Sequence, residues 1–146
     1  MRLAIFITSI YVLVICWFVG AGLGNAEFAR MRAEREQPYA RVMQEAVNEL
    51  QDYGMPVAYP DRLPPIVYCA ACLQKSEAFG AFTDQVEQII LPENFDITTL
   101  EGHSILVHEY GHFLLTRAGV PSEQQEKLCL ALGNMVFQKF FTAALN

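Results

Sequence analysis

The residues of this sequence with the clearest chemistry lie in one pentapeptide, His108-Glu109-Tyr110-Gly111-His112. On a helix, residues four apart lie on the same face, so both imidazoles can bind one metal ion. Glu109 follows His108 directly and would stand beside the ion, where a carboxylate can act as general base on a metal-bound water molecule. The spacing therefore predicts a metal centre, with zinc as the ion.

The residues around the pentapeptide predict a buried helix. Apolar side chains occupy most positions from Ile105 to Leu115, Ser104 is expected to cap the start, and Gly119 is expected to end the helix. On a solvated helix face, the H-E-x-x-H pattern could arise by chance and have no function. In an apolar helix, three polar side chains without partners would be costly, which favours a shared ion.

Zinc held by two histidines needs a further protein ligand. A second helix, with a capping box of Ser122 and Gln125, is expected from Ser122 to about residue 143. In a helical hairpin, residues equidistant from the turn face each other.

This symmetry selects between two glutamates near the start of the second helix. His112 lies seven residues before Gly119 and Glu126 seven residues after it, whereas Glu123 lies only four residues after it. We therefore expect Glu126 to be the third ligand, with Glu123 as the alternative. Either carboxylate could instead only stabilise a helix N-terminus.

The elements before the pentapeptide predict an α+β fold. A helix is expected over residues 27–52, more firmly over Tyr39–Asp52, because Pro38 should break or kink it and Gly54 should end it. Alternating apolar residues and turn signals then predict a small antiparallel sheet. Its expected strands are Val57–Tyr59, Ile66–Cys69, Ala78–Phe82 and Gln88–Leu91.

The first 26 residues read as a secretory signal peptide. Arg2 precedes an apolar run, and Gly24-Asn25-Ala26 offers small residues for cleavage after Ala26. Residues 27–146 would then form a single exported domain, periplasmic or secreted. The alternative is an uncleaved anchor over residues 3–23, which would be the domain's one link to a membrane.

Charge narrows the classes of partner. The formal net charge is −6, and the expected mature domain has no basic stripe, which argues against nucleic acid and against an anionic membrane surface. Export makes a disulfide plausible. The preferred bridge joins Cys69 or Cys72 to Cys129, and the alternative is a local Cys69–Cys72 bridge.

The stretch Ile105 to Phe137 resembles the two-helix core of zincin metallopeptidases, in the gluzincin arrangement of H-E-x-x-H with a downstream glutamate. More closely, the chain resembles small exported bacterial H-E-x-x-H proteins with a leader, a helix, a Cys-containing sheet and an Ile-x-Leu-Pro strand. The corresponding pieces are Cys69, Ile89-Ile90-Leu91-Pro92 and Leu106-Val107-His108-Glu109. The second helix departs from larger gluzincins, because it lacks their N-E-x-x-x-D or E-x-x-A-D form.

The resemblance implies a minimal zincin-like fold, with His108 and His112 as zinc ligands, Glu109 as base and a glutamate near 123–126 as third ligand. The implied activity is zinc-dependent hydrolysis of peptide bonds in a peptide or protein substrate. The strand around Ile89–Leu91 is expected beside the metal helix, with a free edge for an extended peptide.

The alternative function is a non-catalytic domain that keeps the fold and binds a metal or a partner in the cell envelope. A closed site with a fourth protein ligand, such as Cys72 or His103, would favour that alternative.

Overall fold

The structure is a computed structural model that describes residues 29–31, 34, 36–73 and 80–144. The predicted leader, its cleavage after Ala26 and the anchor alternative lie outside these residues. Chain contacts divide the protein into Met1–Gln37 and Pro38–Asn146. In the first unit the described residues are helical, with an ion pair between Arg30 and Glu34. No helix among the described residues is both long and apolar enough to cross a membrane.

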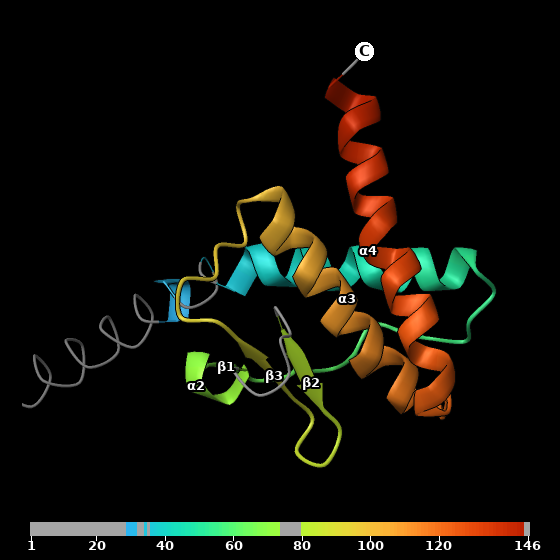
Figure 1. Ribbon diagram of the computed structural model, residues 1–146, viewed down its shortest axis with the longest axis horizontal. Coiled ribbons are helices and arrows are strands. Elements are labelled where there is room, and N and C mark those ends of the chain that lie inside the picture. Colours follow the sequence, from blue (N-terminus) through green and yellow to red (C-terminus); the bar gives the residue numbers. More distant parts are fainter. Residues whose placement is uncertain (1–28, 32–33, 35, 74–79, 145–146) are drawn as a thin grey trace, which may run out of the picture. The chain divides into compact units, whose positions relative to one another are not determined.

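The second unit contains the predicted α+β arrangement, which confirms the fold class (Figure 1). Its first helix continues to residue 52, so the helix predicted over Tyr39–Asp52 is confirmed. Gly54 follows with a φ of 79°, a conformation that suits glycine. The remaining elements are β1 (Ile66–Tyr68), α2 (Ala70–Leu73), β2 (Ala81–Thr83), β3 (Gln88–Leu91), α3 (Leu100–Arg117) and α4 (Ser122–Ala144).

The sheet is mixed, which corrects the prediction of an antiparallel one. Its strand order is β1-β3-β2: β1 pairs parallel with β3 and β2 pairs antiparallel with it. The chain enters β3 through the β2 hairpin, so β3 returns in the direction of β1 and pairs with strands on both sides. The expected free edge at Ile89–Leu91 is therefore wrong, and β2 is the edge strand next to α3.

The expected strand Val57–Tyr59 is also wrong, because these residues form a loop in the structure. Pro56 and Pro60 flank them, and a proline has no N–H to donate to a strand ladder. Val57 is nevertheless buried in the core. Its apolar character reflects this packing rather than pairing in a sheet.

The helix of the pentapeptide, α3, begins more than one turn earlier than expected. The N-cap is Thr99, whose Oγ1 accepts a hydrogen bond from the Gly102 N–H at 3.0 Å. The predicted cap, Ser104, instead lies inside the helix and donates its hydroxyl hydrogen to the Gly133 carbonyl of α4 at 3.0 Å. The predicted end is confirmed, since Gly119 follows the Ala118 C-cap with a φ of 74°.

Helices α3 and α4 pack as the predicted hairpin, and they lie close together at Gly111. A Cβ atom on Gly111 would lie 2.9 Å from the Cys129 Sγ and 2.8 Å from a Leu132 methyl carbon. One apolar core joins the first helix, β3 and both hairpin helices. Its fully buried members include Met43, Leu50, Ile89, Leu91, Leu106, Leu115 and Leu132.

The disulfide joins Cys69 to Cys72, so the preferred bridge to Cys129 is wrong and the local alternative is confirmed. The single turn of α2 brings the two Cα atoms to 5.4 Å. Cys129 is a free thiol buried between α3 and α4 against Gly111. Its place in the helix interface keeps it away from the sheet.

Candidate metal centre

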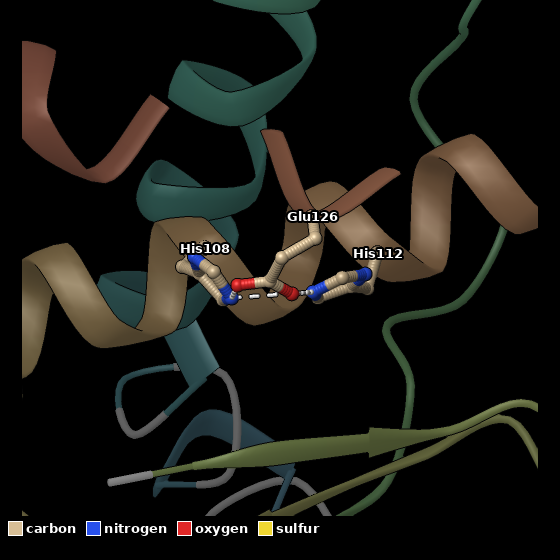
Figure 2. A group of neighbouring side chains, drawn as sticks. All are labelled: His108, His112 and Glu126. Carbon is tan, nitrogen blue, oxygen red and sulfur yellow. Dashed lines mark hydrogen bonds and ion pairs between the residues drawn. The ribbon is translucent and has the colours of Figure 1, made fainter. Parts of the chain in front are cut away.

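Three side chains from the two hairpin helices converge on one point (Figure 2). His108 and His112 lie one turn apart on α3, and their Nε2 atoms are 3.2 Å apart. Glu126 comes from the first turns of α4 and places its carboxylate between the two rings. Its Oε2 lies 3.2 Å from the His112 Nε2, and its Oε1 lies 3.8 Å from the His108 Nε2.

This donor set fits a small divalent cation. Tetrahedral zinc with bonds of about 2.0–2.1 Å places neighbouring donor atoms about 3.3 Å apart. The two imidazole nitrogens are 3.2 Å apart, and each faces a different Glu126 oxygen, at 3.2 Å for His112 and 3.8 Å for His108. One donor atom from each residue lies within 4.8 Å of the other two, so the side chains would have to close slightly around an ion. Two imidazoles and one carboxylate also leave a tetrahedral position for a non-protein ligand.

The structure brings together three of the residues named from the sequence and leaves the alternatives outside. Glu123 is exposed and does not belong to the group. Cys72 is bonded to Cys69, and the His103 Nε2 lies 2.7 Å from the Glu45 Oε2. Among the described residues, neither Cys72 nor His103 supplies a fourth ligand that would close the site.

The surroundings of His108 favour a neutral ring. Burial lowers the pKa of His108, and the neighbouring His112 lowers it further, against the opposing effects of Glu126 and a hydrogen bond with the Cys129 backbone. A histidine must be unprotonated at the nitrogen that binds a metal. The environment of His108 therefore suits metal binding.

Gln125 was not predicted as a site residue, because the sequence pattern placed it in a capping box with Ser122. The Gln125 side chain is buried and reaches His112 instead: its Oε1 lies 3.2 Å from the His112 Nδ1. Its amide also contacts Thr116 and the Val120 carbonyl. Its spacing could have predicted its burial, because Gln125, Cys129 and Leu132 recur on one buried face of α4.

Glu109 lies against β2, where the Phe82 backbone contacts its carboxyl group, and it lines the same cavity as His108 and Glu126. Its exposed fraction is 4%, and burial raises the pKa of Glu109 to about 8, although a hydrogen bond from the Phe82 backbone opposes the shift. A Cβ atom on Gly80 would lie 2.9 Å from the Glu109 Oε1, so glycine leaves room for this carboxyl group. A cation nearby would favour its charged form.

A cavity of about 310 Å³ opens beside the convergent side chains. His108, Glu109 and Glu126 all line it, and Ile105 and Leu130 add apolar walls. A ligand in this cavity would therefore touch a proposed metal ligand and the buried carboxyl group of Glu109 together.

Comparisons of this chain with protein-family models, with curated proteins and with solved structures found no match in any of the three.

Proposed function

We propose that this chain is a zinc-dependent hydrolase of peptide bonds. The observation that carries the proposal is the shared cavity: a set of donors suited to zinc and a buried carboxyl group, Glu109, meet in one space. The sequence resemblance of Ile105–Phe137 to the zincin core supports peptides as the substrate class. Export of the mature domain stays a prediction from the sequence.

In this proposal His108, His112 and Glu126 hold the ion. Zinc, when bound, supplies a Lewis acid that makes a water molecule more acidic and polarises a substrate carbonyl. Glu109 takes a proton from the attacking water molecule and later gives it to the leaving amine. Because the Glu109 side chain is buried and lines the cavity, its carboxyl group would exchange this proton on the cavity side, where the substrate binds.

The edge strand β2 supports a place for an extended substrate. It pairs with β3 on one side, and on the other side the Phe82 backbone faces Glu109 while Gly80 lines the cavity. A peptide added along this edge would bring its backbone to the convergent side chains. This position replaces the edge of Ile89–Leu91 that was expected from the sequence.

One series of variants of the full chain tests the proposal. Metal content is measured by mass spectrometry after zinc is offered and excess metal is removed. We expect one zinc ion per wild-type chain, little zinc in Glu126→Ala, and wild-type content in the matched control Glu123→Ala. A wild-type chain without zinc would contradict the metal centre.

Hydrolysis of a mixed library of quenched fluorescent peptides is measured on the same proteins. Glu109→Gln should keep its zinc and lose about 10²- to 10⁴-fold in rate, because a general base contributes about that much. Glu101→Gln, an exposed change on the same helix, serves as the control. Undiminished hydrolysis by the Glu109 variant would refute its role as base.

A further inference from the structure

The buried amide of Gln125 has only one orientation that suits its neighbours. Its Nε2 lies 2.7 Å from the Val120 carbonyl oxygen. A carbonyl oxygen only accepts hydrogen bonds, so the amide nitrogen must face it. The amide oxygen then faces the His112 Nδ1 at 3.2 Å.

This orientation determines which nitrogen of His112 carries the hydrogen. An amide oxygen only accepts, so the His112 Nδ1 must donate. A neutral imidazole has one N–H, and Nε2 is then left with its lone pair. That same Nε2 lies 3.2 Å from the Glu126 Oε2 and 3.2 Å from the His108 Nε2.

We infer that Gln125 is a positioning residue, which holds His112 in the Nδ1–H tautomer and directs the Nε2 lone pair to the point between His108 and Glu126. The part of the inference that concerns metal affinity rests on the proposed function. The tautomer rests on the contact of the Gln125 Oε1 with Nδ1, which competes in the metal-free chain with the Glu126 Oε2, an acceptor that favours a hydrogen on Nε2. Because Gln125 precedes Glu126 on α4, one turn of this helix supplies both a ligand and the group that orients another ligand.

The amide is itself held in place from the other side of the hairpin turn. The Thr116 Oγ1 lies 3.2 Å from the Gln125 Nε2, and the Val120 carbonyl takes the shorter bond. Thr116 lies in the last turn of α3, and Val120 lies in the loop that joins α3 to α4. The orientation of His112 therefore depends on the hairpin being closed.

The test measures the His112 tautomer in the metal-free full chain by long-range ¹H–¹⁵N correlation spectra of the imidazole rings. Wild type should show the hydrogen on Nδ1. Gln125→Met, which keeps the length of the side chain but removes the acceptor, should lose this preference. Gln125→Glu retains an acceptor oxygen and should retain the tautomer. Gln124→Met, an exposed change on the same helix turn, should have no effect.

Zinc dissociation constants, measured by competition with a chromophoric chelator, give the second readout. We expect zinc binding about 10- to 100-fold weaker in Gln125→Met, the usual cost of losing such a partner, and much less change in Gln125→Glu. The inference would be overturned if Gln125→Met kept the hydrogen on the His112 Nδ1, or if the wild type did not carry it there. If Gln125→Met does not fold, loss of the tautomer in Gln125→Glu would overturn it.

These outcomes separate the inference from the proposed function. A wild-type chain with the expected tautomer but without zinc or hydrolysis would refute the proposed function alone. A chain that binds zinc and hydrolyses peptides but shows the other tautomer would refute the role of Gln125 alone.

Discussion

At the scale of single residues, the contribution of a buried polar side chain to stability depends on whether it has a hydrogen-bond partner. Gln125 and Ser104 are buried, and both have hydrogen-bond partners in the hairpin. Their burial therefore leaves these side chains with hydrogen-bond partners. Tyr110, between the two histidines in the sequence, differs. It is fully buried, and its hydroxyl has no hydrogen-bond partner among the described residues.

Removing the Tyr110 hydroxyl should stabilise the fold. Tyr110→Phe keeps the ring that fills the core and removes a buried polar group whose desolvation costs about 1–3 kcal/mol. We expect the free energy of unfolding to rise by about 1 kcal/mol, measured by denaturant titration of the metal-free protein.

The matched control is Tyr39→Phe, because the Tyr39 hydroxyl lies 2.8 Å from the Tyr68 hydroxyl. Loss of this hydrogen bond should lower the free energy of unfolding by about 0.5 kcal/mol. Equal destabilisation by both variants would mean that the Tyr110 hydroxyl has a stabilising partner.

At the scale of elements, the α3–α4 hairpin does most of the positioning. The two histidines share a face of α3, while α4 supplies Glu126 and, one residue earlier, Gln125. The close approach at Gly111 sets how near the helices lie, and the turn at Gly119 sets which residues face each other. A change in helix spacing should therefore alter the core and the convergent side chains together.

Gly111→Ala tests this spacing. Alanine is the better helix former by about 1 kcal/mol, so propensity alone predicts a gain in stability. The new methyl group would press on Cys129 and Leu132, and overpacking a core costs about 1–3 kcal/mol. We expect the packing effect to dominate and the free energy of unfolding, measured without metal, to fall by about 1–2 kcal/mol.

Adding Cys129→Ala to this variant removes the Sγ atom at the contact and should restore part of the loss. A stabilising effect of Gly111→Ala alone would show that the helices can separate freely at this point.

At the scale of the second unit, ion pairs link elements far apart in the sequence. Glu45 on the first helix pairs with His103 in α3, and Arg117 at the end of α3 pairs with Glu87 in the β2–β3 turn at 3.2 Å. The hydrogen bond to His103 lowers the pKa of Glu45 against the effect of burial, and Lys139 adds a smaller favourable charge.

This shift predicts a pH dependence of stability. Because its pKa is lowered in the folded state, the Glu45 carboxylate stabilises the fold at pH values above its ordinary pKa of about 4.5. This contribution is lost as the pH falls through the pKa of the folded state. Glu45→Gln should therefore flatten the acid limb of a plot of unfolding free energy against pH. The pair is partly exposed, so the effect should be below about 1 kcal/mol.

A double-variant cycle provides the control. In a His103→Gln background, Glu45→Gln should have little further effect on the acid limb, since the partner is already absent. An equal effect in both backgrounds would contradict the assignment of the shift to His103.

Features that depend on local spacing could be predicted from the amino-acid sequence. The four-residue interval of His108 and His112 places both on one helix face, and the count of residues around Gly119 selected Glu126 over Glu123 for the position opposite His112. The strand Gln88–Leu91 and the helix over Tyr39–Asp52 also followed from local periodicity and from the residues that end them.

Features that depend on contacts between distant segments could not be predicted from local patterns and required the three-dimensional structure. The parallel pairing of β1 with β3, the Cys69–Cys72 bridge and the buried position of Cys129 each require knowledge of which elements are neighbours. Gln125 and Ser104 show the same limit at the residue scale. The local sequence pattern predicted that both would cap helices. In the structure, their side chains instead make hydrogen bonds across the hairpin, with Gly133 for Ser104 and His112 for Gln125.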